Sequence, residues 1–298
     1  MTITTAVLAS ARPKFLVLTP LCVMLGYAAV VQTGEIIDPV LLTLLMIAAL
    51  SAHIAVNALN EYQDFTSGLD LRTVKTPFSG GSGALPNNPE AAQAVLALAA
   101  LSLAATVLIG LYLVSLRGAP LLALGLVGVI TILTYTRWLN RHTFLCLIAP
   151  GTAFGLLMVW GTTIALTGKL PVAALWLSLP AFFLVNNLLL LNQFPDVEAD
   201  SSVGRNHLAI RYGRKTAARV FILFLVTTYL CILAAVITGG LAPGALWGLA
   251  TLVLAVPTVI GFCRHAGALE SLQRYLGFNV ALTLLTLALL VTGLLFAR

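Results

Sequence analysis

Charged side chains are scarce in this sequence: they make up 9% of its 298 residues, whereas they supply about a quarter of a soluble globular protein. Hydrophobic residues reach 60%, and the mean hydropathy is +1.02. A soluble fold would lack the polar side chains to cover its surface. The apolar residues form continuous runs, which excludes the alternating pattern of an outer-membrane barrel. The sequence therefore predicts an all-α, polytopic integral membrane protein.

Cysteine is also scarce. The four cysteines lie far apart inside apolar runs, and none belongs to a Cys-x-x-Cys pair, so we interpret them as small hydrophobic residues. This pattern excludes a disulfide-stapled secreted domain. A net charge of +6 is compatible with nucleic-acid binding, but the basic residues flank apolar segments. We therefore expect the lipid bilayer, and no nucleic acid, as the partner.

Long charge-free stretches set the number of membrane crossings, because a helix needs about 20 apolar residues to span the hydrocarbon core. One transmembrane domain over residues 1–298 is predicted, with nine helices at about 15–34, 39–60, 91–116, 118–136, 143–168, 170–194, 217–238, 243–263 and 275–297. A Gly-Pro cluster at 239–244 divides the seventh helix from the eighth. No charged leader or cleavage site precedes the first helix, so we expect it to be retained.

The basic residues predict the orientation of this bundle. All but three of the 16 lysines and arginines fall on the side of the N-terminus, and the exceptions are Arg117, Lys169 and Arg298. Cytoplasmic loops of membrane proteins carry an excess of Lys and Arg. We therefore expect the N-terminus in the cytoplasm and, with an odd number of helices, the C-terminus outside.

Two loops on the predicted cytoplasmic face are long, at about 61–90 and 195–216, while the outer connections are short. They hold seven of the ten acidic residues of the chain, namely Glu61, Asp64, Asp70, Glu90, Asp196, Glu198 and Asp200. Solubility alone does not require this concentration. We interpret the two loops as the halves of one cytoplasmic active site.

The first acidic cluster follows the second predicted helix. Asn60 and Asp64 are four residues apart, so they share one face of a helix. Gly68 permits a left-handed backbone turn, after which Asp70 can return toward the same centre. The cluster therefore predicts one amide and two carboxylates around a common point.

The second acidic cluster repeats this arrangement, with Asn192 four residues before Asp196 and Asp200 four residues after it. Like charges at this spacing repel each other on a helix, so we expect a cation to compensate them. Mg²⁺ takes oxygen ligands, keeps several waters and bridges to substrate phosphates. The sequence predicts Mg²⁺ as the cofactor, with Asp64, Asp70, Asp196 and Asp200 as its ligands.

Basic residues on the same face fit the phosphate part of such a site. We predict Lys75, Arg137 and Arg141 as contacts of a diphosphate, and Arg205 as a further substrate-binding residue. The glycine-rich segment 78–83 offers backbone N–H groups to an anion.

Other polar or small residues have a simpler interpretation. A single Asp-x-x-x-Asp at a helix end is usually a solvated cap, and it is the pairing of two such motifs that favours catalysis. His53 lies within a predicted helix without a second histidine or acid at ligand spacing, so we expect a hydrogen-bonded packing role. Small residues at 151–155 predict a helix-packing face.

The two acidic motifs resemble those of the UbiA superfamily of intramembrane prenyltransferases, which carries one after the second and one after the sixth of nine helices. The matching residues are Asn60, Asp64, Asp70, Asp196 and Asp200. Gly68 stands where the superfamily usually has the last aspartate of the first motif, and this spacing is similar to the 1,4-dihydroxy-2-naphthoate prenyltransferase branch of menaquinone synthesis. Gly204-Arg205 stands where Gly-Lys is usual, which keeps the charge.

The resemblance implies that the motif aspartates hold Mg²⁺ and a prenyl diphosphate. We assign catalytic roles to Asp64 and Asp196, and we expect Asn60 and Asn192 to orient ligands or complete the shell. The prenyl group would pass to an aromatic acceptor, with 1,4-dihydroxy-2-naphthoate as the first choice. 4-Hydroxybenzoate, homogentisate, a porphyrin-type ring and a glycerol lipid stay open, as do the prenyl chain length and the oligomeric state.

Two other classes of membrane protein compete with this interpretation. The repeated Asn-x-x-x-Asp pattern is compatible with the internal repeats of a transporter, but transporter sites typically lie near the bilayer midplane. The acidic residues here gather at the ends of the predicted helices, which favours an enzyme. An intramembrane protease would need its aspartates inside the spans.

Overall fold

The computed structural model describes residues 2–73, 75–76, 79–265 and 269–296. Within these ranges the chain is helical, and no residue belongs to a strand. A helix satisfies its backbone hydrogen bonds within one segment, which is what a chain in lipid requires. The predicted all-α class is confirmed.

Seven helical segments of the described chain are long and apolar enough to cross a bilayer. They are α3 (Pro39–Thr66), α5 (Ala92–Arg117) with the turn η2 (Pro89–Ala91) before it, α7 (Thr143–Gly151) continued by η4 (Thr152–Met158) and α8 (Val159–Thr167), α9 (Val172–Asn192), α11 (Leu208–Ile237), η5 (Pro243–Thr251) continued by α12 (Leu252–His265), and α13 (Leu269–Phe296). Two shorter apolar helices are α2 (Leu18–Val31) and α6 (Ala119–Thr134). The predicted bundle of about nine membrane helices is confirmed.

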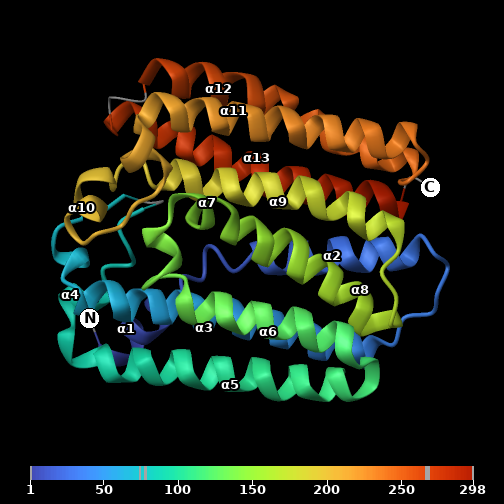
Figure 1. The fold of residues 1–298 in the computed structure, drawn as a ribbon, viewed down its shortest axis with the longest axis horizontal. Coiled ribbons are helices and arrows are strands. Elements are labelled where there is room, and N and C mark those ends of the chain that lie inside the picture. The colour runs from blue at the N-terminus through green and yellow to red at the C-terminus, as the bar shows by residue number, and fades with distance from the viewer. Residues whose placement is uncertain (1, 74, 77–78, 266–268, 297–298) are drawn as a thin grey trace.

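Several short helical elements gather at one end of this bundle. They are α1 (Ile3–Ser10), η1 (Leu69–Leu71), α4 (Ala84–Asn87), η3 (Leu139–Arg141) and α10 (Val197–Ser202). Figure 1 shows α1, α4 and α10 at this end together with the N-terminus, while the C-terminal end of the described chain lies at the opposite one. We call the first of these ends the motif end, because the loops with the acidic clusters lie there.

The helices form two groups with a third between them. α11, α12 and α13 lie along one side of the molecule, α3, α5 and α6 lie along the other, and α2, α7, α8 and α9 run between them (Figure 1). The largest apolar core joins α2, α9, α11 and α13 through fully buried side chains such as Leu25, Leu184, Phe221 and Leu287. This core holds one side of the bundle together.

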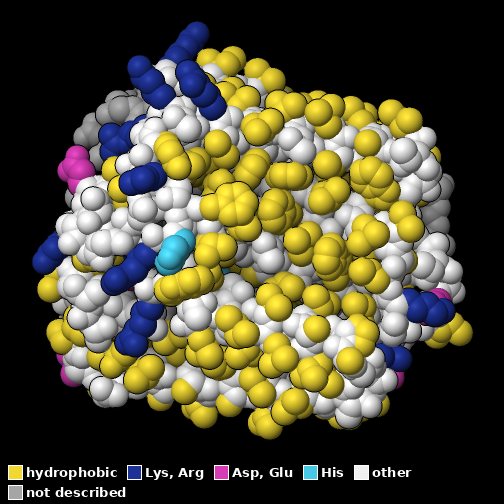
Figure 2. All heavy atoms as spheres, in the orientation of Figure 1, with side chains coloured by type: hydrophobic (Ala, Val, Ile, Leu, Met, Phe, Trp, Pro, Cys, Tyr) yellow, Lys and Arg dark blue, Asp and Glu magenta, His cyan; other side chains and the backbone are white. Residues whose placement is uncertain are grey.

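Basic side chains are unevenly distributed between the two ends. On the face of the molecule drawn in Figure 2, most of the Lys and Arg side chains lie near the motif end, and apolar side chains cover the middle. At the opposite end, Lys169 pairs with Glu35 at 2.8 Å, and Arg117 donates to the Ala165 carbonyl. Arg298 lies outside the described residues. An apolar girdle between polar ends is what a bilayer requires.

Glycines allow close contact between the helices. A Cβ atom on Gly155 would lie 2.4 Å from the Phe182 backbone nitrogen, so η4 and α9 touch through their main chains. Gly151, the last residue of α7, donates its N–H to Asn186 Oδ1 at 2.6 Å, which adds a bond between α7 and α9. The packing role predicted for the small residues at 151–155 is confirmed.

Gly155→Ala should destabilise the protein, because the new methyl group meets backbone atoms that cannot rotate away. We expect the free energy of unfolding in detergent to fall by about 1–3 kcal/mol. Gly110→Ala is the matched control, since no atom lies within 4 Å of a Cβ placed there. Equal melting temperatures of the two variants would contradict this packing account.

Candidate active site

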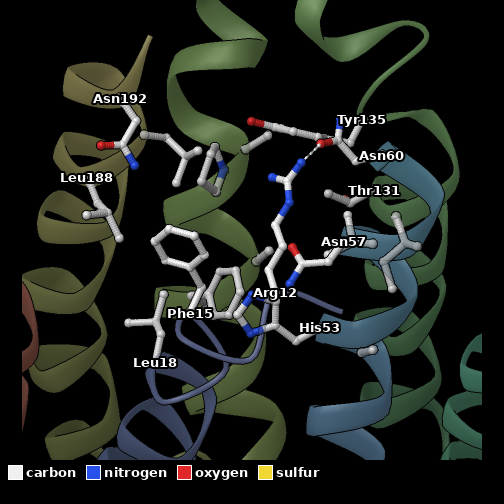
Figure 3. Close-up of a pocket in the computed structure, with 18 of the residues that line it drawn as sticks. Arg12, Phe15, Leu18, His53, Asn57, Asn60, Thr131, Tyr135, Leu188 and Asn192 are labelled. Atoms are coloured by element: carbon white, nitrogen blue, oxygen red, sulfur yellow. Dashed lines mark hydrogen bonds between the residues drawn. The ribbon is translucent and has the colours of Figure 1, made fainter. Parts of the chain in front are cut away.

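A cavity of about 790 Å³ extends from the motif end into the bundle. Its walls come from α2, α3, α6, α7, η4, α8 and α9, with a contribution from α13. In Figure 3, Asn60, Tyr135 and Asn192 lie at one end of the cavity, and Phe15 and Leu18 lie deeper. The cavity therefore has a polar mouth and an apolar interior.

Helix α3 lines both parts of this cavity with a single face. Its lining residues include Leu45, Ala49, Val56, Asn60 and Asp64, spaced by about one or two helical turns. Along this face the side chains change from apolar to polar toward the motif end. One face of α3 thus contributes both to the apolar interior and, through the first acidic motif, to the polar mouth.

The first acidic cluster has the local geometry that its spacing predicts. Asn60 donates from Nδ2 to Asp64 Oδ2 at 3.0 Å, one turn away on α3. Gly68 is left-handed, with φ of 77°, and starts the turn η1 that carries Asp70. Asp70 is buried and lines the cavity with Asp64. The predicted return of the chain at Gly68 is confirmed.

The second acidic cluster is less regular than a helix. α9 ends at Asn192, and Asp196 is the N-cap residue just before the separate short helix α10, so these two residues do not share a helix face. Asn192, Asp196 and Asp200 nevertheless line the same cavity as the first cluster. Asp196 Oδ2 accepts a hydrogen bond from the Gly80 N–H at 3.2 Å.

Arg205 joins the two clusters. One guanidinium nitrogen contacts Asp64 Oδ1, and the other donates to Asp200 Oδ1 at 2.8 Å. His207 Nε2 lies 3.3 Å from the second Asp200 oxygen. Since Asp64 and Arg205 are 141 residues apart in sequence, this ion triple fixes the ends of α3 and α10 beside each other.

The glycine-rich loop lies at the cavity mouth, where its backbone N–H groups donate hydrogen bonds to carboxylates. Gly80 donates to Asp196, and Ser82 donates its N–H and its hydroxyl to Glu61. Glu61 is fully buried and also pairs with Arg12 at 3.0 Å. The first part of the predicted loop, including Phe78, lies outside the described residues.

The cations predicted for the diphosphate lie in different surroundings. Arg205 lines the cavity, whereas Lys75, Arg137 and Arg141 are exposed and do not line it. The side chain of Lys75 packs against Gly83 of the glycine-rich loop. The roles assigned to these three residues stay predictions.

Arg12 lines the cavity. From the sequence, it counts only as one of the basic residues that predict the orientation of the bundle. It lies in the break between α1 and α2 with φ of 51°, a left-handed value that costs free energy in a non-glycine residue. Its Nη2 donates to Asn60 Oδ1 at 3.1 Å and to Glu61 Oε2 at 3.0 Å. Figure 3 shows this side chain extended along the cavity toward Asn60.

His53 lies in the cavity wall and has the packing role expected of it. Its Nδ1 lies 2.8 Å from Thr19 Oγ1, and its ring meets the edge of Phe154 at 4.8 Å between centroids. His53 is buried, so the hydrogen bond satisfies a polar group inside the bundle.

Asp70 and Asp196 each bury one carboxylate oxygen that has no hydrogen-bond partner. Burial, together with the charges of Glu61 and Asp64, raises the pKa of Asp70 to about 7. Burial, together with Asp200, raises the pKa of Asp196 to about 7. Burial alone would lower the pKa of Arg205, but its two carboxylate partners reverse this and raise it.

These electrostatics fit a divalent cation at the mouth. Among the side chains that the structure describes, no three acidic, histidine or cysteine groups come together around one point. Mg²⁺ does not need such a cage, because it commonly takes one or two carboxylates and completes its shell with water and phosphate oxygens. The unpartnered oxygens of Asp70 and Asp196 are suited to that smaller role.

A profile of the UbiA prenyltransferase family matches residues 18–283, which is most of the chain and includes both acidic motifs. The chain belongs to the UbiA prenyltransferase family. It is therefore an integral membrane prenyltransferase. Of the three classes considered from the sequence, the family match supports the prenyltransferase and not the transporter or the intramembrane protease.

Relatives of this UbiA protein include two named 1,4-dihydroxy-2-naphthoate octaprenyltransferase. The protein from Bacillus subtilis (strain 168) is 28% identical over 256 residues, which cover 85% of this chain and 81% of the relative. The protein from Escherichia coli (strain K12) is 27% identical over 270 residues, which cover 88% and 85%.

Solved UbiA structures share the fold. A UbiA homolog from Aeropyrum pernix K1 superimposes with a TM-score of 0.68 at 17% identity over 98% of both chains. A UbiA homolog from Archaeoglobus fulgidus, bound to DMAPP and Mg²⁺, gives a TM-score of 0.62 at 14% identity over 95% of this chain and 98% of that one.

Arg205→Met should destabilise the UbiA protein strongly in Mg²⁺-free buffer, because it leaves Asp64 and Asp200 buried without their partner. We expect a loss of about 3–5 kcal/mol in the free energy of unfolding. Arg72→Met is the control, since Arg72 is exposed and donates a hydrogen bond to the Ser202 hydroxyl. A loss no larger than that of the control would contradict the ion triple.

The stability of the metal-free protein should fall as the pH rises from 5 to 8. In the fold, burial and neighbouring carboxylates raise the pKa of Asp70 and of Asp196 to about 7, from 3.8 for a solvated aspartate, so the folded state binds more protons than the unfolded state in this range. The free energy of unfolding that the protonated forms of Asp70 and Asp196 contribute is present at low pH and is lost as the pH passes 7. The double variant Asp70→Asn/Asp196→Asn should flatten the profile measured by denaturant unfolding with EDTA, whereas Asp38→Asn should not.

Proposed function

We propose that this chain transfers a prenyl group from a prenyl diphosphate to 1,4-dihydroxy-2-naphthoate in a Mg²⁺-dependent reaction, acting as one transmembrane domain. The observation that carries the proposal is a cavity of about 790 Å³ whose charged mouth opens into an apolar interior. A prenyl diphosphate has the same two parts, an anionic head and a hydrocarbon tail. The naphthoate acceptor rests on the names of relatives that are 27–28% identical.

The apolar interior would take the prenyl tail. Leu18, Leu45, Phe154, Met158 and Leu188 line it from four different elements. Burial of each CH₂ group of the tail contributes about 0.8 kcal/mol. The same walls would keep water from the allylic carbon while its bond to the diphosphate is broken.

The mouth would bind the diphosphate between carboxylates and cations. Asp70 and Asp196 are the aspartates best placed to hold Mg²⁺, with Asp64 and Asp200 beside them and Asn60 and Asn192 orienting the shell. When bound, Mg²⁺ supplies Lewis-acid stabilisation of the departing diphosphate.

The guanidinium groups of Arg12 and Arg205 would stabilise the negative charge that grows on the diphosphate as the carbon–oxygen bond breaks. The electron pair of that bond stays with the diphosphate. The electron-rich ring of the acceptor then supplies the electrons for the new bond to the allylic carbon. The attacked ring carbon loses its proton, or carbon dioxide if it carries the carboxyl group, and the ring becomes aromatic again. Lys75, Arg137 and Arg141 are exposed at the motif end, where they can attract the anion before it enters.

We further propose that the motif end faces the cytoplasm, with the N-terminus on that side and the C-terminus outside. The excess of Lys and Arg at this end supports the orientation. Both substrates would then be taken from the cytoplasmic side of the membrane.

The decisive assay uses the purified protein in detergent with a labelled prenyl diphosphate and a panel of acceptors. 1,4-Dihydroxy-2-naphthoate should be prenylated fastest, with diphosphate released in equal amount, and EDTA should abolish the reaction. Preference for 4-hydroxybenzoate, homogentisate, a porphyrin-type ring or a glycerol lipid would overturn the acceptor while keeping the enzyme class.

Asp64→Asn and Asp196→Asn should each lower the rate constant of prenyl transfer by ~10²-fold or more, because each removes a charge from the diphosphate site. Glu198→Gln is the matched control, since Glu198 lies two residues from Asp196 but is exposed. Near-normal turnover of both aspartate variants would remove these residues from the mechanism.

A further inference from the structure

A second hollow, of about 270 Å³, lies between α12 and α13 near the motif end. Its lining includes Pro257, Ile260 and Arg264 of α12 and Arg274, Tyr275 and Phe278 of α13. None of these residues lines the large cavity. We call this hollow the α12–α13 groove, and the proposed prenyl transfer makes no use of it.

The groove is shaped by specific contacts between the two helices. A Cβ on Gly261 would lie 1.9 Å from the ring of Tyr275, so the absence of a side chain on α12 is what lets this ring enter. The Arg274 guanidinium lies 5.3 Å from the centre of the Phe278 ring, within cation–π distance. This contact limits the movement of a long side chain and holds its charge at the groove.

Two positive charges face the groove. Arg264 and Arg274 are both exposed, and among the side chains that the structure describes neither forms an ion pair. Arg presents a planar set of N–H donors that matches phosphate geometry. A pair of arginines at a membrane boundary is therefore suited to a phosphate group.

The outer face of α12 continues the groove as an apolar track toward the middle of the bundle. Val253, Val256 and Ile260 recur at helical spacing and are 74%, 56% and 45% exposed, and Arg264 follows one turn later. Figure 1 shows α12 at the edge of the bundle, which agrees with the exposure of these side chains. The track has room for a hydrocarbon chain whose polar end reaches the arginines.

We propose that the α12–α13 groove is a binding site for an anionic phospholipid. Arg264 and Arg274 hold its phosphate, and one acyl chain lies along Val253, Val256 and Ile260. An anionic headgroup is favoured over a zwitterionic one because both charges in the groove are positive. A lipid is favoured over free phosphate because the apolar track runs directly from the arginines.

The test measures which lipids stay on the protein. The full-length chain, delipidated in a neutral detergent, is mixed with equal amounts of phosphatidylglycerol and phosphatidylcholine at low ionic strength, and bound lipid is counted by native mass spectrometry. We expect a preference of about tenfold or more for phosphatidylglycerol. Arg264→Gln/Arg274→Gln should remove most of this preference while leaving the melting temperature unchanged.

Arg211→Gln/Arg219→Gln is the matched control, because it removes two exposed charges near the motif end that do not line the groove. Retention of the preference in this control supports the site. An equal loss in both double variants would show a general effect of surface charge and overturn it. Displacement of the lipid by millimolar inorganic phosphate, or equal binding of both lipids by the unmodified protein, would also overturn the proposal.

Discussion

The ion triple of Asp64, Arg205 and Asp200 is the interaction on which the active site depends. It joins the end of α3 to the loop after α10, two segments that sequence separates by 141 residues. Such a buried group of charges is favourable only when every member is paired, since an unpaired buried charge costs several kcal/mol. The cavity mouth therefore exists in this form because the two acidic motifs hold one cation between them.

The remaining polar groups of the mouth are arranged around this triple. The glycine-rich loop donates N–H groups to Glu61 and Asp196, and Arg12 approaches from the break between α1 and α2. Asp70 and Asp196 keep one unpartnered oxygen each, so the site combines satisfied charges with two carboxylate oxygens that still lack a partner. This combination suits a prenyltransferase, which must hold the multiply charged diphosphate of its substrate while keeping water out of the apolar interior of the cavity.

The wall of the apolar interior includes a segment that departs from regular α-helical geometry. Pro150 interrupts α7, and the chain continues as the π-helical turn η4, which supplies Phe154, Leu157 and Met158 to the wall. Such turns occur mostly as single insertions in α-helices and often lie at functional sites. Close main-chain contact at Gly155 fixes this irregular segment against α9. A rigid wall beside an open interior follows from these local features.

The sequence by itself determined the all-α membrane class, the positions of the apolar segments, both acidic motifs and the turn at Gly68, because hydropathy and backbone preference act over a few neighbouring residues. It did not distinguish the cations that line the cavity from those that face solvent. Arg12 lies inside, while Lys75, Arg137 and Arg141 lie outside. Only the tertiary structure decided this, since a long basic side chain at a helix end can point either way until neighbouring helices surround it.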